Sequence, residues 1–187
     1  MVTTPASPLE SLQQWIEQCV IDLSLCPFAG IPYRSGKVRI VVCSDNSESA
    51  YLQLIENELA NLVKDTGQIE TTLIAAQKTL GNFLEFNDFL NSVENLLHAE
   101  NLESVVQMAS FHPFYRFTGV AENDVGNFTN RAPYPVVQWL RTSSVARAVD
   151  STDTLAIPDK NIMRMRSMRP EQLNSLFPWC TKSGGGE

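Results

Sequence analysis

Residues 38–43, Val-Arg-Ile-Val-Val-Cys, form the stretch that decides the fold, and a polar turn at 44–47 follows it directly. Short runs of β-branched residues bounded by turn residues are typical of buried strands. After the turn, apolar residues recur at the spacing of one buried helical face: Leu52, Ile55, Leu59 and Leu62. A second apolar run, Thr-Thr-Leu-Ile-Ala-Ala at 71–76, follows them. The sequence therefore predicts a strand, a helix and a second strand.

The same alternation extends in both directions from this unit. Residues 7–10, Ser-Pro-Leu-Glu, form a capping box that predicts the start of a first helix, which Pro27 ends. A further amphipathic helix, capped by Asn82 or Asn87, precedes a third strand at 104–111. Strands that alternate with single helices favour a parallel sheet, and a mixed sheet is the alternative. We therefore expect an α/β or α+β fold with a small parallel or mixed sheet of about three to four strands flanked by helices.

The second half of the chain is less regular. Residues 112–135 have no sustained period but contain several aromatic side chains, so we predict a long ordered loop. After it we expect a helix over about 135–149, an edge strand over 154–157 and a short helix over 171–177. We expect residues 1–182 to form a single globular domain and the Gly-rich residues 183–187 to form a flexible tail.

The composition is that of a soluble domain with an acidic surface. The chain has 187 residues, a formal net charge of −7 and a pI of about 4.9. This charge repels nucleic acids and anionic lipids, so we expect neither as a partner. No apolar run approaches the ~20 residues that span a bilayer, and no targeting segment is recognisable. With four scattered cysteines, these features favour a cytoplasmic location and reduced thiols; the oligomeric state stays open.

Polar residues gather where a ligand site is expected. Ligands bind open α/β sheets at the carboxyl ends of the strands, and the loop after the third predicted strand starts at that edge. The candidate ligand-binding residues are Tyr115, Asn127, Asn130, Arg131, Tyr134 and Arg141. Positions 131, 134, 138 and 141 share one helical face if the following helix starts early. Two arginines there can fork a carboxylate or phosphate, so we expect a small anionic ligand; a solvated helix face is the alternative.

Two residues are candidates for catalysis. His112 directly follows the third predicted strand, where an imidazole can act as general acid or base near neutral pH. Cys26 is the candidate nucleophile, although the carboxyl end of a helix does not lower a thiol pKa. The alternatives are a histidine that hydrogen-bonds loop carbonyls and a cysteine buried as a small apolar residue.

Cofactor motifs are not found in the sequence. No spacing of cysteine and histidine matches a metal site, so we expect no metal. The chain also lacks a Gly-rich phosphate loop and the nucleophile elbow of serine hydrolases. The need for a cofactor, and whether the protein is an enzyme, stay open.

Three segments resemble one known family. They are Leu-Cys-Pro-Phe-Ala at 25–29, Ser-Phe-His-Pro-x-Tyr-x-Phe at 110–117 and Asn-Phe-Thr-Asn-Arg-Ala-Pro-Tyr-Pro at 127–135. Together they resemble the bacterial family known as domain of unknown function 1415, and the resemblance extends to Ile-Pro-Asp-Lys-Asn-Ile at 157–162. It implies a cytosolic bacterial protein of about this length and gives weight to the motif residues. It implies no reaction.

The chain departs from the family pattern just after Tyr134. There the resemblance leads us to expect a histidine and, four residues later, a carboxylate in the helix, whereas this chain has Gln138 and Thr142. If the histidine and the carboxylate are an acid and a base in relatives, this protein either lacks that chemistry or does not use these two positions for it.

Two functional hypotheses follow. The first is a small-molecule enzyme or binding protein whose candidate residues converge in a polar pocket for an anionic ligand. The second is a structural or protein-interaction module in which the same side chains tie the loop to the sheet. The first predicts an open cleft, and the second predicts buried polar groups that satisfy one another.

Overall fold

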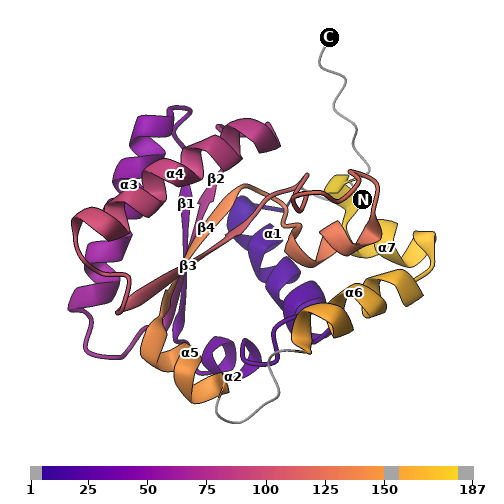
Figure 1. The fold of residues 1–187 in the computed structure, drawn as a ribbon, viewed down its shortest axis with the longest axis horizontal. Helices are drawn as coiled ribbons and strands as arrows, with labels where there is room; N and C mark the ends of the chain where they lie inside the picture. The colour runs from indigo at the N-terminus through magenta and orange to yellow at the C-terminus, as the bar shows by residue number, and fades with distance from the viewer. Residues whose placement is uncertain (1–5, 150–155, 181–187) are drawn as a thin grey trace.

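Helices cover both faces of a central sheet (Figure 1). The structure, a computed structural model, describes residues 6–149 and 156–180. Its strands are β1 (Val38–Cys43), β2 (Thr71–Ala76), β3 (Val106–Phe111) and β4 (Val136–Arg141). Its α-helices are α1 (Pro8–Trp15), α2 (Gly30–Arg34), α3 (Glu48–Lys64), α4 (Phe83–Ala99), α5 (Thr142–Val149), α6 (Ile157–Ser167) and α7 (Pro170–Leu176). The π-helical turn η1 (Ile16–Ile21) and the 3-10 turns η2 (Val125–Asn130) and η3 (Pro178–Cys180) complete the described elements.

The four strands form a mixed sheet in the order β1-β2-β4-β3. β1 and β2 are parallel, whereas β4 is antiparallel to both of its neighbours, β2 and β3. β3 therefore points in the same direction as β1 and β2 without touching either. The expectation of an α/β fold with a small mixed sheet is confirmed.

The helix predicted over 135–149 is wrong in its first half, because residues 136–141 form the inner strand β4. Pro135 holds the preceding residue in extended geometry, and Val-Val-Gln-Trp-Leu suits a pleated surface. β4 occupies the position between β2 and β3 and supplies the hydrogen bonds of both. The helix begins only at Thr142, so Gln138 and Arg141 lie on a strand and share no helical face with Arg131 and Tyr134.

Each face of the sheet has its own core. On one face α3 and α4 pack against alternate residues of β2 and β4, which include Ile74, Val137 and Trp139. On the other face, α1, α6 and α7 pack against their neighbours in the strands, such as Ala75 and Val136. The opposite placement of Val136 and Val137 follows from the two-residue period of a strand.

Buried hydrogen bonds fix α3 onto the sheet. The Tyr51 hydroxyl donates to the Ile74 carbonyl at 2.8 Å and accepts the Val137 N–H at 3.2 Å. The Trp139 indole donates to the carbonyl of Ile55 at 3.1 Å. Because these groups have no access to water, the bonds also set the register between helix and strands.

The ends of the chain differ in part from expectation. The capping box is confirmed, since the Ser7 hydroxyl accepts from Glu10 N–H at 3.2 Å and the Glu10 carboxylate accepts from Ser7 N–H at 2.7 Å. The first helix ends at η1, before Ser24 takes a left-handed conformation with φ of 52°. Residues 154–155 of the predicted edge strand lie outside the described residues, and its other half is not a strand, because Ala156 is the N-cap of α6 and Ile157 begins that helix. The predicted tail also lies outside the described residues.

Candidate functional site

The long loop leaves β3 at the edge where the parallel strands end. Phe111 pairs with Val136, so the loop starts and returns at the same end of the sheet. Between these points η2 packs against α6, and the side chain of Ile162 lies against Gly126. The loop is therefore enclosed between the sheet edge and the C-terminal helices, as the view in Figure 1 shows.

His112 is completely buried at the start of this loop. Its Nε2 lies 3.0 Å from the carbonyl of Leu80, and its Nδ1 accepts the Phe114 N–H at 3.0 Å. Because a carbonyl only accepts, Nε2 bears the proton and Nδ1 is the acceptor. Burial, and to a lesser extent the charge of Arg131, lowers the His112 pKa from 6.5 to about 4. His112 is thus a neutral imidazole with both nitrogens engaged by the backbone.

The two asparagines also bind backbone groups. Asn127 is fully buried; its Oδ1 accepts from Phe117 N–H at 3.1 Å, and its Nδ2 donates to the carbonyl of Ala121 at 2.8 Å. Asn130 Nδ2 donates to the carbonyl of Ser110 at 3.3 Å, which ties η2 to the end of β3. Both side chains therefore join separate backbone segments by hydrogen bonds, and such side chains are called clasps below.

Arg131 differs from its neighbours because its hydrogen-bonding capacity is not used up. The residue is only 8% exposed, and one Nη2–H donates to the carbonyl of Glu122 at 3.1 Å. Its Cζ lies 4.4 Å from the centre of the Phe128 ring. It forms no ion pair with any carboxylate in residues 6–149 and 156–180, and its buried Nε has no hydrogen-bond partner there.

The C-terminal turn η3 covers the same region. Phe177 packs edge-on against Phe128 with ring centres 5.0 Å apart, and against Trp179 at 5.7 Å. The thiol of Cys180 donates to the carbonyl of Pro113 at 3.3 Å. Burial raises the Cys180 pKa, and Arg131 opposes part of this rise, so the thiol lies beside the guanidinium. The buried Trp179 Nε1 is a second N–H without a partner in the described chain.

The two tyrosines contribute mainly apolar contacts. The Tyr115 ring packs against Phe83 at 5.2 Å and against Phe117 at 5.0 Å. Tyr134 is half-buried against the core that contains α1 and α7. Both tyrosines therefore contribute to the apolar packing around the loop.

Cys26 is half-buried in the turn that precedes α2. Burial raises its pKa, and backbone N–H groups of Phe28 and Ala29 oppose part of the rise. Within the described residues no hydrogen bond or ring contact joins Cys26 to His112. Its role as a nucleophile stays a prediction.

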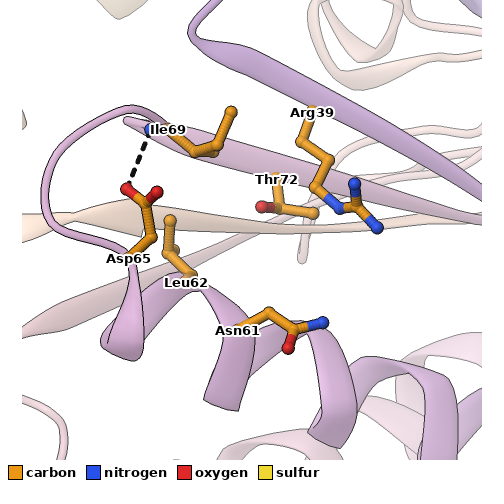
Figure 2. A pocket seen from close by; sticks show the side chains of 6 residues that line it. All are labelled: Arg39, Asn61, Leu62, Asp65, Ile69 and Thr72. Atoms are coloured by element: carbon orange, nitrogen blue, oxygen red, sulfur yellow. Dashed lines mark hydrogen bonds between the residues drawn. The ribbon is translucent and has the colours of Figure 1, made fainter.

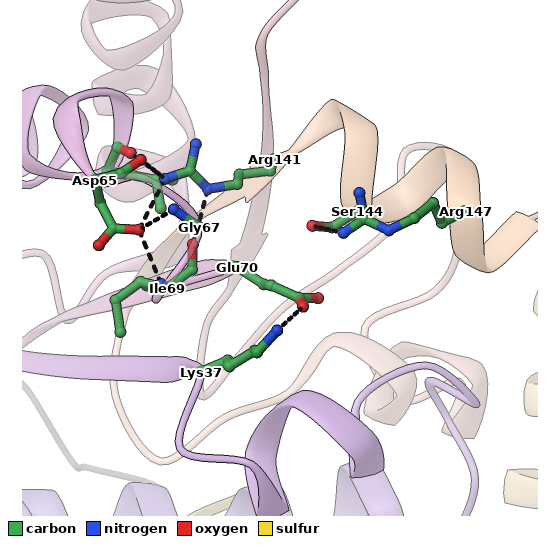
Figure 3. A network of polar contacts seen from close by, with 9 residues as sticks. Lys37, Asp65, Gly67, Ile69, Glu70, Arg141, Ser144 and Arg147 are labelled. Atoms are coloured by element: carbon green, nitrogen blue, oxygen red, sulfur yellow. Dashed lines mark hydrogen bonds and ion pairs between the residues drawn. The ribbon is translucent and has the colours of Figure 1, made fainter.

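Arg141 lies at the opposite end of the strands from the loop. It pairs with Val106, five positions along β3 from Phe111, which separates it from the loop by about 17 Å. Its Nε donates to the carbonyl of Ile69 at 2.8 Å, and its Nη2 donates to the carbonyls of Leu62 and Asp65 at 2.5 and 2.7 Å. An ion pair with the Asp65 carboxylate at 3.1 Å completes the network shown in Figure 3. Arg141 therefore shares no site with Arg131.

Gln138 and Thr142 also take structural positions. Gln138 Nε2 donates to the Thr71 hydroxyl at 2.8 Å between neighbouring strands. Thr142 begins α5, and its buried hydroxyl has no partner among the described residues. One residue is on a strand and the other on a helix, so the two do not form a pair on one helical face.

Two hollows occur away from the loop. One of about 260 Å³ is lined by Arg39, Asn61, Leu62, Asp65, Ile69 and Thr72 (Figure 2). The other, of about 350 Å³, is lined by Glu171, Gln172, Ser175 and Leu176. Neither is lined by a residue that the sequence suggested for ligand binding. Sequence reasoning also missed Trp179, Cys180 and Thr72, because nothing in their local sequence indicates what they meet in the fold.

Among the described residues there is neither a metal-binding cluster nor a membrane-spanning helix. No group of three or more His, Cys, Asp or Glu side chains there is arranged to hold a metal ion. No helix in the same ranges has the length and apolar character needed to cross a bilayer.

Comparison with known proteins identifies a family and nothing closer. Residues 8–175 match the family described as "Protein of unknown function (DUF1415)". No curated protein and no solved structure matches the chain.

Proposed function

The chain belongs to the DUF1415 family, whose description assigns no activity, and we propose from the geometry of its own residues that it binds a small anionic ligand through Arg131. The observation on which this proposal mainly rests is a guanidinium buried to 8% exposure with no carboxylate partner in the described chain. An unpaired buried charge costs several kcal/mol, on the order of the stability of many domains. An anion that pairs with the charge would recover much of that energy.

The hydrogen-bonding state of Arg131 also favours an anion. Its Nε–H is buried without a partner, and orphaned buried N–H groups are rare in native proteins. Nε and one Nη of a guanidinium form a planar fork that matches two oxygens of a carboxylate or a phosphate. A small ligand of that chemistry would satisfy the orphaned donor and the charge together.

The distribution of charge supports entry of an anion from the side of α6. Residues 44–103, which include α3 and α4, contain 11 acidic and two basic residues. By contrast, α6 and the residues just after it expose four basic side chains and one acidic one, Asp159; the basic ones are Lys160, Arg164, Arg166, which pairs with Asp124 at 3.3 Å, and Arg169. Because α6 packs against η2, the positive end of this asymmetry lies beside the Arg131 loop. Such a field attracts anions over long distances.

The state of His112 supports ligand binding rather than catalysis as the function of this region. With a pKa of about 4, His112 is neutral near pH 7, and both ring nitrogens already bond to the backbone. A general base needs a free nitrogen within reach of its substrate. We therefore assign His112 to the support of the site, and the catalytic hypothesis for His112 and Cys26 stays a prediction.

The test is equilibrium unfolding in urea, with sodium phosphate or sodium succinate added at constant ionic strength. A ligand that binds only the folded state raises the free energy of unfolding with concentration as RT ln(1 + [L]/Kd). We expect this rise in the wild type and expect Arg131→Gln to remove it. Since phosphate stabilises many proteins by exclusion from their surface, Arg34→Gln, an exposed arginine on α2, is the matched control. Equal stabilisation of all three proteins would contradict the proposal.

A structural or interaction module is the second candidate, and a specific observation favours it. His112, Asn127 and Asn130 bond to backbone groups of the loop and its neighbours, as expected of clasps. Under this candidate Arg131 would be one more clasp. The unfolding experiment distinguishes the two candidates. If Arg131 is a clasp, Arg131→Gln lowers the free energy of unfolding by the same amount with and without the anion.

A further inference from the structure

The hollow between α3 and the amino-terminal ends of β1 and β2 is a second site, unrelated to Arg131. Arg39 and Thr72 are cross-strand neighbours in the parallel pair, and α3 covers the face they share (Figure 2). The hollow measures about 260 Å³, close to the lower end of ligand pockets, which start near roughly 300 Å³. It lies at the same sheet edge as the Arg141 network and opposite the long loop.

The charges around this hollow are already paired. Glu58, only 4% exposed, accepts from Arg39 Nε at 2.7 Å and from Arg39 Nη2 at 3.0 Å. Asp65 pairs with Arg141 at 3.1 Å and also accepts the N–H groups of Gly67 and Ile69. Each carboxylate thus has its own arginine. The hollow offers no net charge to a ligand.

Three polar groups that line the hollow have hydrogen-bonding capacity that no described residue uses. Thr72 is 1% exposed and lines the hollow, and its hydroxyl, which is not sealed off from solvent, has no hydrogen-bond partner among the described residues. Arg39 uses Nε and Nη2 for Glu58, which leaves Nη1 as a donor. Asn61 donates through Nδ2 to Glu58 at 3.3 Å, which leaves its Oδ1 as an acceptor.

These groups define the chemistry of the ligand. A donor, an acceptor and a hydroxyl that can play either role complement a carboxamide, whose oxygen accepts and whose NH₂ donates. Leu62, 2% exposed, and half-buried Ile69 supply an apolar wall for the rest of the molecule. We propose that the hollow lined by Arg39, Asn61 and Thr72 binds a small uncharged molecule with a carboxamide group on an apolar body.

The experiment compares three probes of nearly equal shape and different charge: benzamide, benzoate and benzamidinium. Each is titrated into the ¹⁵N-labelled full chain, and the resonances of the Thr72 amide, the Asn61 side chain and Arg39 Nε are followed. We expect saturable shifts with benzamide and weaker binding of both ions. A preference for either ion, or the lack of a saturable shift with benzamide, would overturn the proposal.

Thr72→Val is the decisive variant, because valine keeps the shape and favours a strand. Losing one hydrogen bond should weaken benzamide binding by roughly tenfold. Thr118→Val, at an exposed loop position, should bind as the wild type does. If Thr72→Val does not fold, Asn61→Ala on the exposed side of α3 tests the acceptor instead. Unchanged binding in the folded variant would contradict the assignment, while Arg131→Gln should not affect it.

Discussion

One arginine lies at each end of the strands of the sheet, and the two arginines are used differently. Arg141 donates to the carbonyls of Ile69, Leu62 and Asp65 and pairs with the Asp65 carboxylate. Arg131 has one carbonyl partner, lies over an aromatic ring and leaves Nε unbonded. A guanidinium that the fold itself satisfies stabilises the structure, whereas one that the fold leaves incomplete is suited to a ligand.

The difference arises from what each arginine meets. Arg141 faces the turn between α3 and β2, where several carbonyls converge and an aspartate is present. Arg131 faces aromatic rings and the Cys180 thiol, which are poor acceptors. The polar groups near Arg131 are already bonded, since His112 and Asn127 are both engaged by backbone groups.

Removing Arg141 should have the largest effect on stability. Arg141→Ala removes one donor from the Asp65 carboxylate and one from each of three carbonyls, so we expect a loss of about 2–4 kcal/mol in the free energy of unfolding. Urea unfolding measures this value. Arg147→Ala, on the exposed side of α5, should change it by less than about 0.5 kcal/mol. Similar losses in both variants would remove the structural role of Arg141.

Acid should weaken the loop edge through His112. The folded pKa of about 4 lies below the unfolded value of 6.5, so the unfolded chain binds the proton first and stability falls as the pH decreases between these values. We expect His112 to account for a loss on the order of 3 kcal/mol over that range. The free energy of unfolding of His112→Gln should therefore depend less on pH.

The matched control for this prediction is His98→Gln. His98 is the other histidine of the chain; its side chain is 82% exposed and pairs with Glu103 at the surface, where an ion pair contributes little to stability. It should keep the pH dependence of the wild type. A His112→Gln curve parallel to that of the wild type would show that His112 does not resist protonation in the folded protein.

Asn127 should show a moderate effect that sharpens the contrast with Arg131 inside one loop. Asn127→Ala removes a buried clasp between Phe117 and Ala121, so we expect a loss of about 1–3 kcal/mol. Asn123→Ala, exposed in the same loop, is the control. If Asn127→Ala unfolds like the control, the loop is not held together by its asparagine.

Arg131 should show the smallest effect of all in the absence of ligand. Arg131→Gln removes one carbonyl bond and the contact of the guanidinium with the Phe128 ring, and it also removes the cost of an unpaired buried charge. These effects oppose each other, so we expect a net change within about 1 kcal/mol in either direction. Urea unfolding in a buffer without phosphate or carboxylates measures it. A loss as large as that of Arg141→Ala would make Arg131 a structural arginine.

Local sequence was sufficient for much of the fold. The Ser7 capping box and the strands at 38–43 and 71–76 occur where the pattern predicts them, because caps and β-branched runs act within a few residues. Residues 136–141 were predicted wrongly because Val-Val-Gln-Trp-Leu-Arg fits a helix as well as a strand. These residues form a strand because they fill the position between β2 and β3 in the sheet. That tertiary position cannot be read from the local sequence.

The candidate site was only partly predictable for the same reason. The loop at the sheet edge and the presence of Arg131 in it follow from the sequence. The separation of Arg141 from Arg131 depends on the direction of β4, which reverses the edge at which Arg141 lies. The proximity of Cys180 to Arg131 comes from packing across almost fifty residues of chain.

The most direct test of the account follows the Nε–H resonances of Arg131 and Arg141 in one ¹⁵N spectrum. Each is identified by its loss in Arg131→Gln or Arg141→Lys, and sodium succinate is then added to the wild type at constant ionic strength. We predict that the Arg131 resonance shifts saturably, because its Nε has no partner among the described residues. The Arg141 resonance should stay in place, because the Ile69 carbonyl already accepts from its Nε. An Arg131 resonance that does not move, or that moves in parallel with that of Arg141, would contradict this prediction.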